Sequence, residues 1–148
     1  MTPTFDDLWN AATAWGEQQE RRIGSDGRAL SPDEVQLAVK VGVRSPERIR
    51  VLIVPVVPFP VDPFIHEIGA QVGLAANSSG GMTLDYGIYI REDQKGRRDI
   101  WPHEFRHVAQ YECLGGIRAF MFVYLKELLH FGYGSGPLEI DAKKAENA

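Results

Sequence analysis

The sequence predicts an α+β fold, with helices packed against a small, mainly antiparallel sheet. Apolar residues recur at helical spacing near the N-terminus and again after residue 100, while two stretches between them, 48–57 and 81–92, carry strand-like patterns. Strands flanked by groups of helices are typical of this class. With 148 residues, 44% of them hydrophobic, the chain can bury one core, so we expect a single domain over residues 1–148.

Two helices are expected in the N-terminal third of the chain. Apolar residues spaced three and four apart predict an amphipathic helix over residues 5–20, which ends in the polar run 17–22. Residues 31–34, Ser-Pro-Asp-Glu, combine an N-cap serine, a proline at the first helical position and an acidic first turn. A second helix therefore begins there, and Gly42 is expected to stop it.

The strand-like patterns lie in the middle of the chain. Residues 48–57, RIRVLIVPVV, predict a strand that becomes buried, because β-branched residues dominate it. Prolines between residues 55 and 63 then favour an extended segment along the sheet edge, with a short helix or an irregular stretch at 65–74. After a loop at 78–81, the sequence GMTLDYGIYIRE predicts a second strand, and the charged residues 91–99 predict a surface loop.

Charge and composition exclude several classes of protein. A net charge of −4 with scattered charges gives no basic stripe, so we expect no nucleic-acid partner. The N-terminus is acidic and broken by Pro3, unlike a secretory signal, and the apolar stretch 117–129 is interrupted by charges and too short to span a bilayer. We therefore expect a cytoplasmic protein with no membrane partner. A single cysteine, Cys113, excludes an internal disulfide and a cysteine-rich zinc framework.

The motif His103-Glu104-Phe105-Arg106-His107 lies on a predicted helix, residues 102–114, that Gly115 and Gly116 end. Residues four apart on a helix differ by only about 40° in direction, so both imidazoles can reach one ion. Glu104 lies beside that face and can act as a base toward a water on zinc. The alternative interpretation is an ordinary helix with two histidines facing solvent.

A catalytic zinc needs a third protein ligand and an open position. Cys113 lies on the same helix, roughly 9 Å along the axis from His107, and is expected to be a small core residue. Glu139 is the better candidate, because it lies on a later helical piece, 138–145, after a glycine turn that lets the chain return. Asp141 is the alternative third ligand, or an outer partner that fixes a ligand histidine.

HEFRHVAQYE together with PLEIDA resembles small bacterial metallopeptidase domains of the zincin class, in the gluzincin-like group. The resemblance covers about the last half of the chain, from GMTLDYGIYI onward. It implies one Zn2+ per chain held by His103, His107 and Glu139, with Glu104 as the base. It also implies a zincin-like fold in which the strand before the motif helix is an edge along which a peptide or protein substrate lies.

Several other polar residues have less certain roles. Arg106 stands where zincins usually have an uncharged residue, and it either orients Glu139 or Asp141 or reaches solvent. Tyr133 could steady an oxyanion or simply pack. Gln110 and Tyr111 either line the cleft or simply pack. His66 and His130 are expected to be structural or surface histidines.

These observations favour a zinc-dependent hydrolase, a metallopeptidase in which Glu104 activates water. A first alternative is a non-catalytic domain in which zinc staples the last helices together and the surface binds a protein partner. That version needs a fourth ligand, for which Asp141 is the candidate. A second alternative is a metal-free interaction domain in which the motif is accidental.

Overall fold

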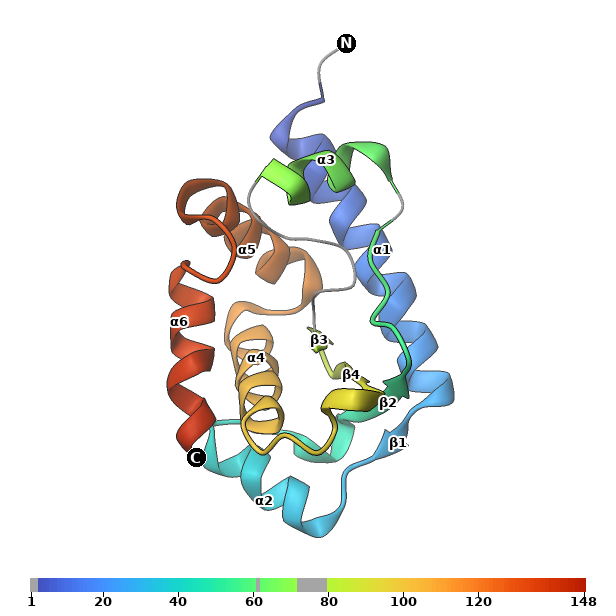
Figure 1. Cartoon of the computed structure of the whole chain (residues 1–148), viewed down its shortest axis with the longest axis vertical. Helices are drawn as coiled ribbons and strands as arrows, with labels where there is room; N and C mark the ends of the chain where they lie inside the picture. The colour runs from blue at the N-terminus through green and yellow to red at the C-terminus, as the bar shows by residue number, and fades with distance from the viewer. Residues whose placement is uncertain (1–2, 61, 72–79) are drawn as a thin grey trace.

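The computed structural model describes residues 3–60, 62–71 and 80–148. Within them, six α-helices surround a four-stranded mixed sheet with the strand order β1-β2-β4-β3, which confirms the α+β class (Figure 1). The helices are α1 (Phe5–Asp26), α2 (Pro32–Lys40), α3 (Pro63–Gln71), α4 (Ile100–Leu114), α5 (Ile117–Phe131) and α6 (Pro137–Lys144), and the strands are β1 (Arg28–Ala29), β2 (Arg50–Val54), β3 (Gly81–Leu84) and β4 (Gly87–Arg91). Short 3-10 turns occupy Pro46–Arg48, Glu92–Gln94 and Ala145–Asn147.

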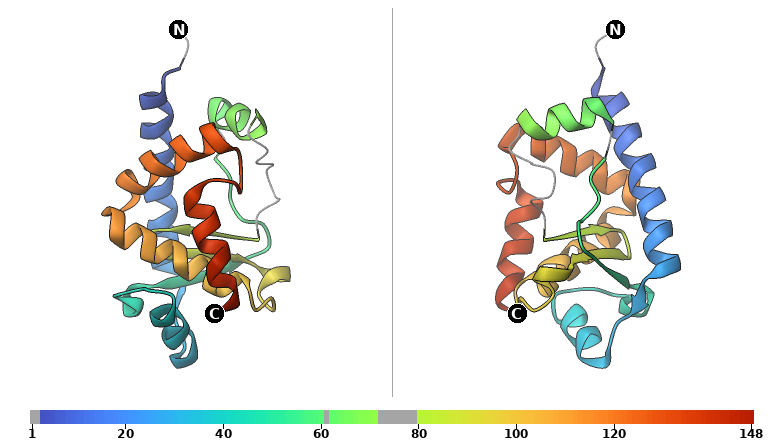
Figure 2. Two further views of the ribbon diagram at one scale, coloured as in Figure 1. Left: turned by 90° about the vertical axis from the view of Figure 1, so that its left-hand side faces the viewer. Right: turned by 45° about the vertical axis from the view of Figure 1, so that its right-hand side comes forward.

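The sheet lies between α4 on one face and α1 on the other (Figure 2), and each face carries its own apolar cluster. On one face, Ile88 and Ile90 of β4 pack with Phe105 of α4, and on the other face Tyr89 packs with Ile23 of α1. This alternation follows from the strand period of two. Helix α5 packs against the N-terminal half of α1. The motif helix α4 is therefore fixed against the sheet along one side, and its other side remains available to the C-terminal helices.

The predicted second strand is instead a hairpin. Leu84 pairs with Gly87, so Asp85 and Tyr86 form a two-residue turn between β3 and β4. Asp85 adopts a φ of 57°, a left-handed conformation that aspartate tolerates better than most residues, and this reverses the chain. As a result only β3 is an edge strand, whereas β4 lies between β2 and β3, so the expected edge position holds for the first part of residues 81–90 and is wrong for the rest.

The sheet is mixed rather than simply antiparallel. The pairings β1–β2 and β3–β4 are antiparallel, whereas the central pairing β2–β4 is parallel. A parallel pair needs a crossover connection. The chain between β2 and β4 supplies it, since it includes α3 and β3 and covers residues 55–86.

The local helix signals predicted some boundaries and missed others. Ser31 is the N-cap of α2 as expected, and its capping box with Glu34 was not predicted; Gly115, with a φ of 107°, ends α4. Helix α1 runs to Asp26 rather than to residue 20, because the fully buried Ile23 anchors its last turns on the sheet. Of the predicted stretch 65–74, residues 72–74 lie outside the described residues, as do 78 and 79 of the predicted loop 78–81.

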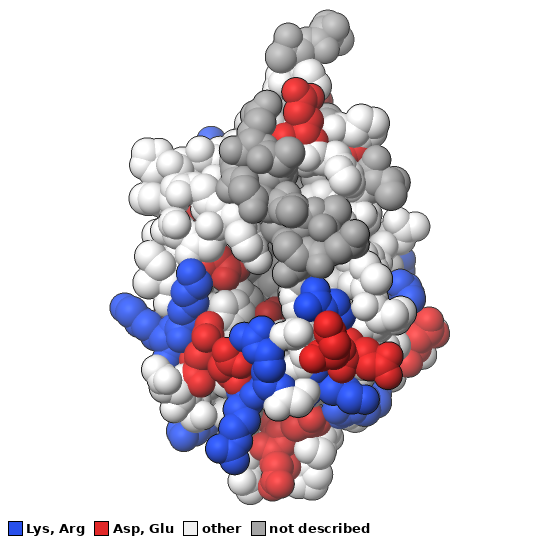
Figure 3. Space-filling model, in the orientation of Figure 1, with Lys and Arg blue, Asp and Glu red and all other residues white. Residues whose placement is uncertain are grey.

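Neither charge sign dominates the face in Figure 3. Lys and Arg alternate with Asp and Glu over its lower half, while the described surface over α5 carries few charges. Among the described residues, no helix combines the length and hydropathy that crossing a bilayer requires.

The β3–β4 turn brings two acidic groups together. The carboxyl groups of Asp85 in the turn and Glu20 on α1 interact, and burial raises the pKa of both. The negative charge of Asp85 raises the pKa of Glu20 further, while the nearby Arg48 opposes both shifts. The pair is therefore less favourable at neutral pH than in acid.

Replacing Asp85 with Asn should raise the free energy of unfolding at pH 7 by roughly 0.5 kcal/mol, the scale of a solvent-screened charge interaction. Because folding raises both pKa values, the protonated pair contributes stability that is present at low pH and is lost as the pH rises through the folded pKa. The gain in the free energy of unfolding from Asp85→Asn should thus disappear below about pH 4, near the pKa values that Asp and Glu have in the unfolded chain. Urea titrations at several pH values measure this, with the exposed Asp26→Asn as control. A pH-independent difference would contradict the explanation.

Candidate metal centre

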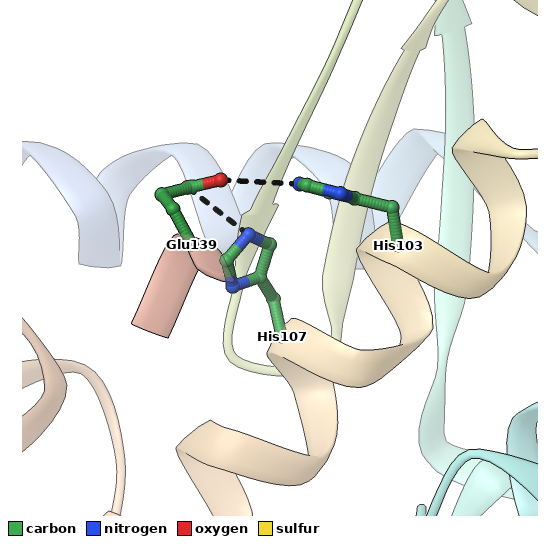
Figure 4. Close-up of side chains that lie close together, drawn as sticks. All are labelled: His103, His107 and Glu139. Atoms are coloured by element: carbon green, nitrogen blue, oxygen red, sulfur yellow. Dashed lines mark ion pairs between the residues drawn. The ribbon is translucent and has the colours of Figure 1, made fainter. Parts of the chain in front are cut away.

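Three side chains from two helices converge at one point beside the sheet (Figure 4). His103 and His107 come from successive turns of α4, and Glu139 comes from the first turn of α6. The Nε2 atom of each imidazole lies 3.2 Å from a carboxylate oxygen of Glu139. The His103, His107 and Glu139 side chains are only 16%, 7% and 14% exposed, so their charges interact with little screening by water. The structure thus brings together the three residues that the sequence analysis selected as ligands.

Helix α6 owes its position to the connection that precedes it. Gly132 and Gly134 have φ values of 81° and 80°, a left-handed conformation that lets the chain turn back from α5. The Glu127 carboxylate of α5 then accepts a hydrogen bond of 2.8 Å from the Leu138 backbone N–H in the first turn of α6. A Cβ atom at Gly136 would lie 2.9 Å from that same carboxylate, so a larger residue there would displace it. These contacts fix the first turn of α6 against α4, and so they fix the position of Glu139.

Each imidazole also has a hydrogen-bonding partner at its Nδ1 atom, the ring nitrogen that does not face Glu139. His107 Nδ1–H donates to Gln110 Oε1 over 2.8 Å, and His103 Nδ1 lies 2.8 Å from a Glu146 carboxylate oxygen. The amide orientation of Gln110 follows from its Nε2, which donates to Leu138 O at 2.9 Å and to Asp141 Oδ2 at 2.8 Å. Both Nδ1 atoms are therefore engaged on the outside, and both Nε2 atoms face Glu139.

The Glu139 carboxylate has its own support. The Tyr124 hydroxyl of α5 donates a hydrogen bond of 3.2 Å to Glu139 Oε1. Tyr124 in turn stacks on Phe120, which stacks on the buried Tyr111 of α4 with 3.7 Å between ring centroids. This column of rings ties α5 to α4 directly beneath the three converging side chains.

Asp141 and Arg106 form a separate ion pair beside the centre. Arg106 Nε lies 2.7 Å from Asp141 Oδ2, and Arg106 also donates to the Val41 backbone carbonyl. Of the two roles considered for Arg106, the structure shows the one in which it orients Asp141. Asp141 acts on the centre through Gln110 and does not join His103, His107 and Glu139, the group of potential ligand atoms found among the described residues.

Glu104 lies one residue from His103 and is almost fully buried. Its Oε1 accepts a hydrogen bond of 2.8 Å from the Thr83 hydroxyl of β3. Thr83 points to the α4 side of the sheet because it alternates with Met82 and Leu84. A Cβ atom at Gly81 would lie 3.2 Å from the Glu104 carboxyl group, so the glycine lets β3 approach it closely.

The four charged groups shift one another's ionisation. Burial alone would lower the pKa of His103, but the hydrogen bond to Glu139 and the negative charges of Glu104 and Glu139 raise that pKa to about 9. Burial also acts to lower the pKa of His107, but the hydrogen bond to Glu139 and the negative charges of Glu139 and Glu104 raise that pKa above its usual value. Burial acts to raise the pKa of Glu139, yet the two imidazoles hold it well below its usual range. Burial raises the pKa of Glu104 despite both imidazoles and Thr83.

The three side chains can each offer one ligand atom to a metal ion. His103 Nε2 lies 3.2 Å from Oε2 of Glu139 and His107 Nε2 lies 3.2 Å from Oε1, and one ligand atom from each residue can be chosen so that all three lie within 4.8 Å of one another. Two imidazoles and one carboxylate are also the donor set of many catalytic zinc sites.

The other residues considered in the sequence lie outside the group of three potential ligands. Cys113 is exposed on the last turn of α4, so the expectation that it is a small core residue was wrong. His66 and His130 are exposed, in agreement with a surface role. Tyr133 is 41% exposed but lines the cavity next to the centre, as Tyr111 does.

Three residues that hold the site were missed in the sequence, namely Tyr124, which donates to Glu139, together with Glu146 and Thr83. Glu146, which holds His103, follows Glu139 by seven residues, a spacing that places both on one helical face and could have revealed it. Thr83, which holds Glu104, is brought to the site by strand pairing and gave no local signal.

Comparisons with known proteins add no relative. Searches with protein-family models, against curated proteins and against solved structures each return no match to this chain. The assignment of the site therefore depends on its geometry.

A zinc ion held by His103, His107 and Glu139 should bind about 10- to 100-fold more weakly when Gln110 is replaced with Met, because the His107 ring loses the acceptor that orients it. Competition with a fluorescent zinc chelator at fixed pH measures the affinity. The exposed Gln36→Met, on α2, is the matched control and should bind zinc like the unaltered chain. Equal affinity in Gln110→Met would show that this hydrogen bond does not orient the ligand.

Proposed function

We propose that this protein is a zinc-dependent hydrolase, a metallopeptidase in which His103, His107 and Glu139 hold one Zn2+ per chain. The observation that supports this best is the paired orientation of the imidazoles. Each is held at Nδ1 by an outer acceptor, and each directs Nε2 at the same buried carboxylate. Outer hydrogen bonds of this kind are the usual support of metal-ligating histidines, and surface histidines have no need of them.

Zinc, when bound there, supplies a Lewis acid that acidifies a water molecule and polarises a scissile carbonyl. Glu104 would accept the proton of the attacking water and deliver it to the leaving nitrogen. The hydrogen bond from Thr83 and the close approach of Gly81 hold the Glu104 carboxylate beside the two imidazoles. Its burial keeps bulk water from competing for the proton.

Two further features suit peptide hydrolysis. The edge strand β3 starts beside Glu104, and its first residues Gly81 and Met82 are only partly buried, so an extended peptide can lie against this end of the strand. Tyr133 lines the same cavity as the three candidate ligands, and burial raises the pKa of its phenol, so it keeps the proton it would donate to a developing oxyanion.

The zinc-stapled alternative needs a fourth protein ligand, since structural sites are usually closed. Asp141 was the candidate, but its carboxylate is engaged by Arg106 and Gln110. Three ligands with a cavity beside them favour an open, catalytic site over a closed one.

Glu104→Gln should retain one zinc per chain and lose hydrolysis by a factor of about 100 to 10,000, because it removes the base and keeps the ligands. Glu139→Ala should lose zinc as well as activity. Metal content is measured by mass spectrometry of the purified protein, and hydrolysis by mass spectrometry of a tryptic peptide mixture incubated with it.

The exposed Glu17→Gln is the matched carboxylate control and should keep both zinc and activity. Full turnover by Glu104→Gln would refute the proposed base. Zinc bound with equal affinity by Glu139→Ala would refute the ligand set.

A further inference from the structure

We propose that the apolar cavity beside the metal centre binds one bulky apolar side chain, a phenylalanine or a branched aliphatic residue, next to the scissile bond of a peptide substrate. This inference rests on the proposed peptidase function and adds the substrate class. Three observations carry it, namely the position of the cavity, the nature of its walls and its volume.

The cavity begins at the metal centre and extends into the apolar interior. His103, Glu104, His107 and Glu139 line one part of it. From there it continues between α1 and α5, whose facing residues Ala12, Leu125 and Leu128 belong to one buried cluster. Met82 and Leu84 of the edge strand β3 also line it. A peptide on β3 with its scissile carbonyl at the centre would therefore have one neighbouring side chain at the cavity.

The walls of the cavity beyond the metal centre disfavour a charged side chain of the substrate. Glu104 and Glu139 are the only Asp, Glu, Lys or Arg side chains among the described residues that line the cavity. Three of the four hydroxyl groups on the walls are engaged within the protein, since Tyr111 donates to Thr83 O, Tyr124 donates to Glu139 and Thr83 donates to Glu104. The fourth belongs to Tyr133, which is assigned above to the oxyanion. A charged substrate side chain would lose its hydration there and find no partner.

The volume sets the size of the occupant. The cavity measures about 180 Å3. Apolar cavities of about 150 Å3 in other proteins stay dry and take up one benzene ring. One phenyl or branched aliphatic group is thus accommodated, and an alanine methyl group would leave most of the space empty.

The test uses a set of zinc-loaded proteins and peptides of one sequence that carry Phe, Leu, Trp, Ala or Asp beside the cleavage site. The full chain should cleave the Phe and Leu peptides at least about tenfold better, in kcat/KM, than the Ala peptide, with the Asp peptide poorest. Ala12→Leu narrows the cavity and should lower the Phe-to-Ala ratio at least about fivefold, whereas Leu128→Ala should shift the preference toward Trp. Ala14→Leu, on the exposed side of α1, is the control and should leave the ratio unchanged.

Binding to zinc-loaded Glu104→Gln, measured by calorimetry, separates this inference from the proposed function. Tighter binding of the Phe peptide than of the Ala peptide, with no cleavage by the unaltered chain, would refute the peptidase and keep the pocket. Cleavage without preference, or a ratio unaffected by both Ala12→Leu and Leu128→Ala, would overturn the pocket and keep the peptidase. Tight binding of a fatty-acyl amide with no preference among the peptides would also overturn the pocket assignment.

Discussion

The buried carboxylate of Glu139, held between two imidazoles of α4, is the interaction on which the C-terminal half of the structure depends. A charged group that is 14% exposed is stable only with compensating partners, and Glu139 has His103, His107 and Tyr124. These partners require α6 to cross α4 at one place. The glycine turn before α6 and the capping contact from Glu127 establish that crossing, and Gln110 and Glu146 then fix the imidazoles from outside.

The sheet supplies the opposite wall of the same site. Because β3 ends the sheet, its residues can reach α4 on one face and the α1–α5 layer on the other. Thr83 uses the first face to hold Glu104, and Met82 and Leu84 use the second to line the cavity. The hairpin turn at Asp85 therefore shapes the site, since it converts one long strand into a central strand and an edge strand.

The parts of this arrangement that the sequence predicted are those encoded by neighbouring residues. The N-cap at Ser31, the glycines after α4 and the helical spacing of His103, Glu104 and His107 are local signals, and the structure bears them out. Selecting Glu139 required a resemblance in addition to the helical pattern. The hairpin was missed because side-chain alternation continues through Asp85, and the last turns of α1 because Ile23 is stabilised by distant residues. Thr83 could be placed only by tertiary contacts, whereas the seven-residue spacing of Glu146 from Glu139 is a local signal that was missed.

The cavity is the feature that packing alone does not explain. An apolar space of about 180 Å3 forfeits the contacts that larger side chains would make there, and such spaces lower the stability of a fold. Ala12 lines the space from α1, and a larger residue at this position would fill part of it. The cost is offset if a ligand fills the space during the working cycle, because its burial then contributes the missing apolar contacts. The space directly adjoins His103, His107 and Glu139. The apolar contacts would therefore stabilise whatever group is bound next to the metal centre, and they can favour its reaction as well as its binding.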